Sequence, residues 1–135
     1  MDKYELIIEE AKKARLNAYS PYSEFKVGAA LMTKDGKIYH GCNVENISYG
    51  LTNCAERTCL FSAVAAGVKK EDIVLFCVVG QTEDPISPCG ACRQVMAELL
   101  DQKCEVVMAN LRGKYKLTTV EELLPFGFKE IENVF

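Results

Sequence analysis

This sequence has little that would suit it to nucleic acid, to a membrane or to secretion. Its Lys and Arg residues form no cluster and its formal net charge is -3, so a polyanion would find no basic surface and no nucleic-acid partner is expected. The longest apolar run, Ile73 to Val79, is far too short to span a bilayer, and the N-terminus lacks a signal-peptide core. We therefore expect a cytoplasmic protein without a membrane partner.

Seven cysteines stand out in a chain of 135 residues that is 49% apolar and 26% charged, the composition of an ordinary globular protein. The length suits a single domain that covers residues 1–135, and there is no repeat or linker. An odd number of cysteines without a secretory signal speaks against a disulfide framework. Metal binding or catalysis is the favoured use of these thiols.

The hydrophobic pattern alternates between helical and strand periods along the chain. Helices are predicted at residues 2–18, 54–67 and 90–101, and a short last helix runs from a capping box at Thr119 to Pro125. Strands are predicted at 25–32, 38–44, 73–79, 106–109 and 114–117, the first two joined as a hairpin. This order predicts an α/β fold, a three-layer α/β/α sandwich with a mixed, mostly parallel five-stranded sheet.

Three cysteines fall at the starts of two predicted helices: Cys54 opens one helix, and Cys89 and Cys92 open another. Helix N-termini carry unpaired N–H groups and a positive dipole end, which lower the pKa of a thiol. Three thiolates can hold zinc and leave its fourth tetrahedral position open, as catalytic zinc requires. Because sulfur ligands favour zinc over magnesium or calcium, the sequence predicts one zinc ion per chain at these cysteines.

Two charged residues follow Cys54 closely and fit the same chemistry. Glu56 lies in the first helical turn, where side chains lean towards the helix N-terminus, so its carboxylate can approach the open side of the metal. There it could take a proton from water and later return it. Arg57 can donate to a ligand sulfur, which would offset the excess negative charge of three thiolates.

Other interpretations of these cysteines stay open on spacing alone. A Cys-x-x-Cys pair could be a redox dithiol, but Cys54 would then be unexplained. A structural zinc site would want a fourth ligand, and the only histidine, His40, lies in the predicted hairpin and is expected to face solvent. The remaining four cysteines lie in apolar or strand contexts and are predicted to be small core residues: Cys42, Cys59, Cys77 and Cys104.

Five blocks of the sequence carry a family resemblance. Two hold the metal chemistry, Cys54 to Arg57 and Pro88 to Gln94, with a first ligand, a glutamate and Pro-Cys-x-x-Cys. The others are Pro21 to Leu31 (apart from Glu24), Gly41 to Asn46, and Glu121 to Pro125. In this order the blocks resemble cytidine deaminases of the small, homotetrameric, zinc-dependent nucleoside type, which place cysteine where nucleic-acid and nucleotide deaminases usually carry histidine.

The resemblance implies an enzyme that uses zinc to deaminate cytidine and deoxycytidine by hydrolysis, giving uridine and deoxyuridine plus ammonia in pyrimidine salvage. Glu56 would be its proton shuttle, which takes a proton from water and protonates pyrimidine N3. Two alternatives are a non-catalytic, zinc-stabilised interaction module and an aminonucleoside-antibiotic deaminase.

The resemblance also assigns the contacts with a nucleoside. Phe25 would pack against the base, Ala55 would contact the substrate, and Asn43 and Glu45 would hydrogen-bond the ribose 3′-hydroxyl.

Two aromatic residues would reach the site from neighbouring subunits of a homotetramer. Tyr49 matches one, and Phe128 matches the other by its spacing from the Leu-Leu-Pro turn. Phe126, directly after Pro125, departs from the family pattern.

Overall fold

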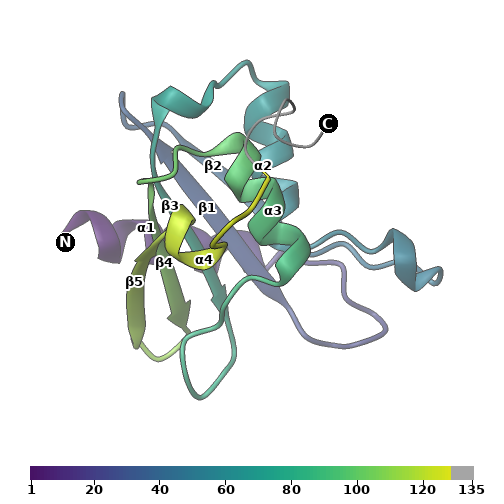
Figure 1. The fold of residues 1–135 in the computed structure, drawn as a ribbon. Coiled ribbons are helices and arrows are strands. Elements are labelled where there is room, and N and C mark those ends of the chain that lie inside the picture. Colours follow the sequence, from purple (N-terminus) through teal and green to yellow (C-terminus); the bar gives the residue numbers. More distant parts are fainter. Residues whose placement is uncertain (129–135) are drawn as a thin grey trace.

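The computed structural model describes residues 1–128, which form one five-stranded sheet with helices on both faces (Figure 1). The α-helices are α1 (Lys3–Arg15), α2 (Ala55–Ala65), α3 (Gly90–Leu99) and α4 (Val120–Leu123), and the short 3-10 helices are η1 (Tyr49–Leu51) and η2 (Lys70–Asp72). The strands are β1 (Val27–Thr33), β2 (Ile38–Cys42), β3 (Ile73–Gly80), β4 (Glu105–Asn110) and β5 (Tyr115–Thr119). Each predicted helix and strand is present, with shifted ends. In the described residues, no helix has the length and apolarity that crossing a bilayer would need.

The strand order is β2-β1-β3-β4-β5, and the sheet is mixed, as predicted. The prediction that it is mostly parallel is wrong, because only β3 and β4 pair in parallel. Strand β1 lies between β2 and β3 and is antiparallel to both. Residues 111–114 alone join β4 to β5, and a parallel connection would need a dozen residues or more, so these strands form a second hairpin.

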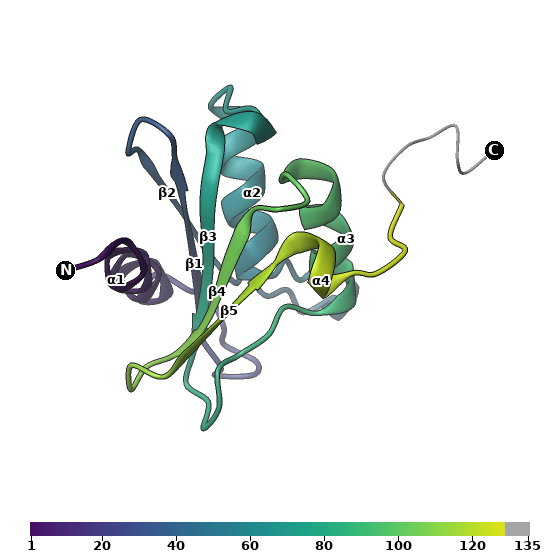
Figure 2. The ribbon, with the colours of Figure 1, turned by 60° about the vertical axis from the view of Figure 1, so that its left-hand side comes forward.

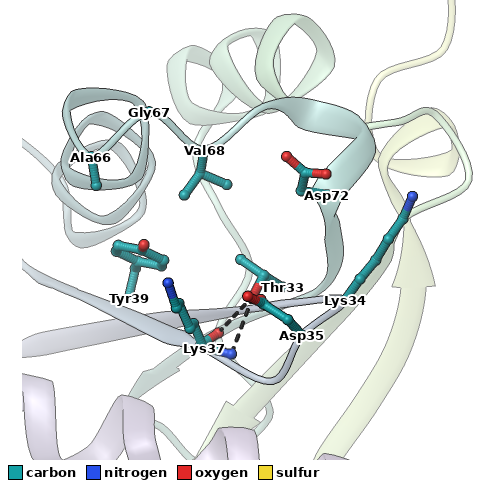
Figure 3. A pocket seen from close by; sticks show the side chains of 9 residues that line it. All are labelled: Thr33, Lys34, Asp35, Lys37, Tyr39, Ala66, Gly67, Val68 and Asp72. Carbon is teal, nitrogen blue, oxygen red and sulfur yellow. Dashed lines mark hydrogen bonds between the residues drawn. The ribbon is translucent and has the colours of Figure 1, made fainter.

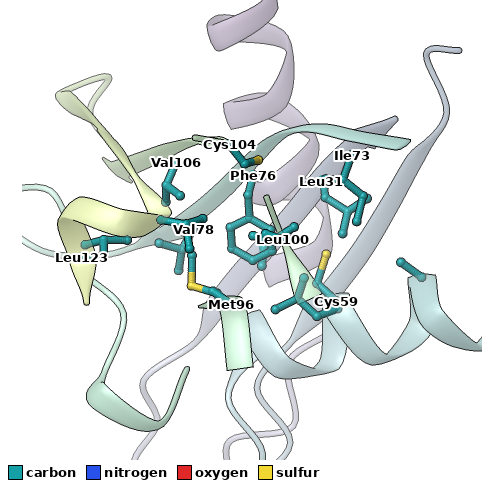
Figure 4. Close-up of a cluster of buried hydrophobic side chains, with 14 of the residues drawn as sticks. Leu31, Cys59, Ile73, Phe76, Val78, Met96, Leu100, Cys104, Val106 and Leu123 are labelled. Atoms are coloured by element: carbon teal, nitrogen blue, oxygen red, sulfur yellow. The ribbon is translucent and has the colours of Figure 1, made fainter. Parts of the chain in front are cut away.

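The three layers are confirmed, with α1 on one face of the sheet and α2, α3 and α4 on the other (Figure 2). Alternate residues of β3 serve the two faces: Leu75 and Cys77 pack on the α1 side, whereas Phe76 and Val78 pack on the α2 and α3 side. Figure 4 shows Phe76 in the buried cluster on the α2 and α3 side of the sheet, close to Met96. Burial on both faces explains why β3 has no polar alternation.

Two glycines let the helices lie directly on the sheet. A Cβ at Gly28 of β1 would be 2.1 Å from the carbonyl oxygen of Ala11 in α1. A Cβ at Gly41 of β2 would be 2.3 Å from the backbone nitrogen of Cys59 in α2. Neither position has room for a side chain, and Gly41 therefore sets how closely α2 approaches the sheet.

A hollow lies where the β1–β2 hairpin turns and α2 ends, with a volume of about 420 Å³ (Figure 3). Its lining includes Lys34 and Lys37 of the turn, together with Asp72 beyond α2. The hollow lies at the far end of β1 and α2 from Cys54, and the described metal-ligating cluster is not part of it.

Candidate active site

The three predicted metal ligands come together at two helix starts. Cys54 is the N-cap residue of α2, Cys89 is the N-cap residue of α3, and Cys92 lies in the first turn of α3. Their sulfur atoms all lie within 4.8 Å of one another. Cys92 is buried, Cys54 is partly exposed and Cys89 is exposed, so one side of this thiol cluster is open to solvent. The positive ends of two helices therefore meet at one group of sulfur atoms.

The charges around the thiol cluster suit a cation with soft ligands. The pKa of Cys54 is lowered to about 5, first because the Cys92 thiol donates a hydrogen bond to it and then because Arg57 lies beside it. The same pairing, together with burial, raises the pKa of Cys92. Arg57 donates from Nη2 to the Cys54 sulfur at 3.4 Å, and its buried Nε has no partner in the described residues. Three thiols with an adjacent guanidinium fit zinc by donor chemistry.

Glu56 supplies the carboxylate beside the cluster. Its side chain is in the first turn of α2 and the residue is only 5% exposed. Burial, with a smaller contribution from the charge of Cys54, raises the pKa of this carboxyl to about 7. A group with that pKa can both accept and donate a proton near neutral pH. Ala55, directly before it, is fully buried.

Phe25 and Asn43 meet at the end of β1 and β2 that faces the cysteine cluster. The Asn43 side chain is buried, donates from Nδ2 to the Phe25 carbonyl at 2.8 Å and accepts from the Val27 N–H at 2.9 Å. The Phe25 ring is 38% exposed, and its tip lies against Gly80, where a Cβ would be 3.3 Å from Phe25 Cζ. Gly80 ends β3, and the loop after it leads to Cys89.

Glu45, like Asn43, contacts the loop that precedes β1. Its carboxylate accepts from the backbone N–H groups of Tyr22 and Ser23 at 3.0 and 3.1 Å, and from the Ser23 hydroxyl. These hydrogen bonds, the hydroxyl first, lower the pKa of Glu45. A hollow of about 410 Å³ opens beside Glu45 and is also lined by Tyr49. Ser23 lies within the block Pro21 to Leu31, but nothing local in the sequence indicates its contacts with Glu45.

The aromatic residues expected to reach other subunits are exposed. Tyr49 is 75% exposed in η1, on a loop that projects from the body of the molecule in Figure 1, and its ring meets Tyr22 edge-on. Phe128 is 66% exposed, and Gln94 holds its backbone with hydrogen bonds of 3.0 and 3.4 Å. The Phe126 side chain is fully exposed.

His40 and three of the four cysteines outside the cluster lie where the sequence predicts, but the prediction that Cys42 is a core residue is wrong, because it belongs to neither buried cluster. Cys59, Cys77 and Cys104 are buried, and burial raises the pKa of each thiol. Cys42 is partly buried. His40 is exposed and pairs with Glu10 at 2.9 Å, away from the thiol cluster.

Thiol ligands and a buried glutamate, at two helix starts beside a mixed sheet, define a class: the zinc deaminases, in which the glutamate is an acid–base group and not a ligand. Residues 1–108 match the family described as "Cytidine and deoxycytidylate deaminase zinc-binding region". The chain belongs to this family.

Three known proteins show how similar the chain is to named relatives. It is 54% identical to a cytidine deaminase from Sporosarcina psychrophila, over 93% of this chain and 91% of that protein. The crystal structure of cytidine deaminase from Burkholderia pseudomallei superposes with a TM-score of 0.91 at 58% identity, covering 95% of this chain and all of that one. A blasticidin-S deaminase from Bacillus cereus is 28% identical, over 95% of this chain and 94% of that protein.

Proposed function

We propose that this protein deaminates cytidine and deoxycytidine by hydrolysis, giving uridine or deoxyuridine and ammonia, and that residues 1–135 are one catalytic domain. The observation that carries this proposal is the thiol cluster with a buried carboxylate beside it, at the starts of α2 and α3. Membership of the deaminase family, and 54% identity to a relative named cytidine deaminase, support the same activity.

Cys54, Cys89 and Cys92 would hold one zinc ion, and Arg57 would offset the negative charge of their sulfur atoms. Zinc with three protein ligands lowers the pKa of water at its open position to about 7 and so supplies a nucleophile at neutral pH.

Glu56 would move the protons of the reaction. Its carboxylate accepts a proton from the attacking water and delivers it to N3 of the pyrimidine, which makes C4 more electrophilic. Once water has added at C4, Glu56 takes the proton of the new C4 hydroxyl and gives it to the 4-amino group; the C4–N bond breaks, ammonia leaves and the C4 carbonyl of uridine forms. The low exposure of Glu56 supports this role, because burial keeps bulk water from competing for the proton.

The charge of the hollow near Glu45 favours a nucleoside over a nucleotide. Its lining residues are Tyr22, Ser23, Glu45, Tyr49 and Thr52, which include a carboxylate and no Lys or Arg. A phosphate in this hollow would find no cation among these residues and would be repelled by Glu45. Asn43 and Glu45 would bind the ribose 3′-hydroxyl, Phe25 would pack on the base, and Ala55 would contact the substrate.

A turnover assay with zinc analysis tests the proposal. Purified protein should release uridine and ammonia from cytidine, contain one zinc per chain and leave cytidine monophosphate unchanged. Glu56→Gln should keep its zinc and lose turnover by a factor of about 100 to 10,000, the range for losing an acid–base group. The matched control is Glu71→Gln, an exposed residue, which should keep full activity. A fully active Glu56→Gln variant would refute the assignment.

The same assay separates the alternatives. An interaction module would bind zinc and release nothing from cytidine. An antibiotic deaminase would prefer an aminonucleoside antibiotic to cytidine; the 28% identity to a blasticidin-S deaminase, against 54% to a cytidine deaminase, favours the nucleoside.

We also propose a homotetramer in which neighbouring subunits complete each site with Tyr49 and Phe128. The exposure of both rings, and of Ile47 and Leu51 on the same projecting loop as Tyr49, supports an interface there. Sedimentation equilibrium measures the assembly directly. A role in cytoplasmic pyrimidine salvage fits the seven unpaired thiols, which suit a reducing compartment.

A further inference from the structure

The hydroxyl of Ser23 lies between two residues with separate proposed roles. Ser23 Oγ donates to the Glu45 carboxylate and accepts from the Phe25 N–H at 3.0 Å. A hydroxyl has a single proton to donate, so this assignment uses it on the carboxylate and leaves a lone pair for the amide. One side chain thus contacts both Glu45 and the backbone of Phe25.

The loop around Ser23 folds onto Glu45 and depends on it. The carboxylate also accepts from the N–H groups of Tyr22 and Ser23, so three donors from two adjacent residues converge on one acceptor group. Glu24, the next residue, has a φ of 58°, in the left-handed region that non-glycine residues seldom adopt. Its N–H donates to the Ser20 carbonyl at 2.9 Å and closes the turn. These contacts reverse the chain sharply just before Phe25.

Phe25 is held at both of its backbone polar groups. Its N–H donates to Ser23 Oγ, and its carbonyl accepts from Asn43 Nδ2 at 2.8 Å. The ring then lies against Gly80, at the end of the strand that leads to Cys89. The position of the ring therefore depends on Asn43 and Glu45, the two polar residues that follow β2. Asn43 binds the Phe25 carbonyl directly, whereas Glu45 acts through Ser23.

We propose that Ser23 is a positioning residue that couples recognition of the sugar to recognition of the base. It holds the carboxylate of Glu45 in place for the 3′-hydroxyl and fixes Phe25 against the pyrimidine through the same hydroxyl group. The carboxylate keeps one lone-pair site that no donor in the described residues uses, so the sugar hydroxyl can bind without displacing Ser23. This inference rests on the proposed function, because the roles of Glu45 and Phe25 come from it.

Ser23→Ala tests the coupling with two substrates. On cytidine, KM should rise about 10-fold, as expected for losing a hydrogen bond to a charged group, while kcat stays within about threefold. On 3′-deoxycytidine, which has no 3′-hydroxyl for Glu45 to bind, the rise in KM should be less than about threefold. Ser23→Thr keeps the hydroxyl and should restore the KM of the wild type on cytidine. Ser62→Ala is the control, because Ser62 is exposed on α2 and its hydroxyl bonds only the backbone carbonyls of His40 and Cys59.

A second measurement needs no turnover. Hydrogen exchange of the Phe25 amide should accelerate in Ser23→Ala and, more weakly, in Glu45→Gln, but not in Ser62→Ala. An equal rise in KM on both substrates, or unchanged exchange of the Phe25 amide, would overturn the role of Ser23. Wild-type protein that leaves cytidine intact would instead overturn the proposed function, and the exchange data would still decide whether Ser23 links Glu45 to Phe25.

Discussion

Replacing Gly41 by alanine should damage the metal site from a distance. The added Cβ would lie 2.3 Å from the Cys59 nitrogen, 2.5 Å from the Ala55 carbonyl oxygen and 2.6 Å from Cys59 Cβ. Two of these atoms are backbone atoms of α2, so a change of rotamer cannot relieve the clash. Normal contact distances require α2 to move away from β2 by about 1 Å, and overpacking of this kind costs about 1–3 kcal/mol of folding stability.

The displacement of α2 would move one half of the site relative to the other. Cys54 and Glu56 belong to α2, whereas Cys89 and Cys92 belong to α3. A shift of about 1 Å in a catalytic group can cost about 100-fold in rate. Gly41→Ala should therefore lose about two orders of magnitude in kcat/KM and should bind zinc more weakly.

Gly28→Ala is the matched control on the opposite face. Its Cβ would lie 2.1 Å from the Ala11 carbonyl oxygen, so it would displace α1 and destabilise the fold to a similar degree. Chemical denaturation measures both losses, and competition with a chromogenic chelator measures zinc affinity. The expected pattern is two destabilised variants of which only Gly41→Ala loses zinc affinity. Equal loss of zinc in both variants, or normal zinc binding and kcat in Gly41→Ala, would refute the argument.

Three further predictions concern single side chains. Arg57→Gln should weaken zinc binding about 10- to 100-fold, measured by chelator competition, because the sulfur atoms lose their cationic donor. Burial raises the thiol pKa values of Cys59 and Cys77 in the folded protein, so above about pH 8.5 these thiols lose their protons in the unfolded chain first. The unfolding free energy should therefore fall by up to about 1.4 kcal/mol per pH unit for each thiol. Stability is thus complete below that pH and declines above it; urea unfolding of Cys77→Ala should show a shallower decline than the wild type, and an identical slope would contradict this. Phe128→Leu should raise the KM for cytidine at least about fivefold, whereas Phe126→Leu should change it less than about twofold, because only the Phe128 backbone is held by a helix side chain; equal effects in steady-state assays would contradict the assignment.

The sequence predicts the elements of this fold because each has a clear local signal. The uniform apolar run of β3 indicates a strand buried on both faces, and the structure has it between the two cores. The direction of β5 was predicted wrongly although the turn length was visible: the predicted strands at 106–109 and 114–117 leave only residues 110–113 between them, too few for a crossover, so only a hairpin is possible. The alternating order of helices and strands favours parallel pairing, and the short turn overrides it.

In the candidate site too, local features could be predicted from the sequence and long-range contacts could not. The thiol cluster could be predicted because spacing and helix starts are local features, and the structure brings its sulfur atoms within 4.8 Å. The contacts of Glu45 could not, since its partners lie 22 and 23 positions away and two of them are backbone N–H groups that carry no residue signal. The hydrogen bond from Gln94 to the Phe128 carbonyl joins residues 34 positions apart, and no local sequence pattern predicts it either.

Helix α3 uses three consecutive residues to reach three different parts of the molecule. Cys92 belongs to the thiol cluster, Arg93 donates to the Leu123 carbonyl at the end of α4, and Gln94 holds the backbone of Phe128. Because the three residues share one short helix, a displacement of its backbone would shift all three contacts together. The helix therefore ties the position of the proposed zinc ligand Cys92 to that of the Phe128 backbone. In the proposed homotetramer, where Phe128 would line a neighbouring site, a displacement of α3 would therefore alter the pocket of another chain.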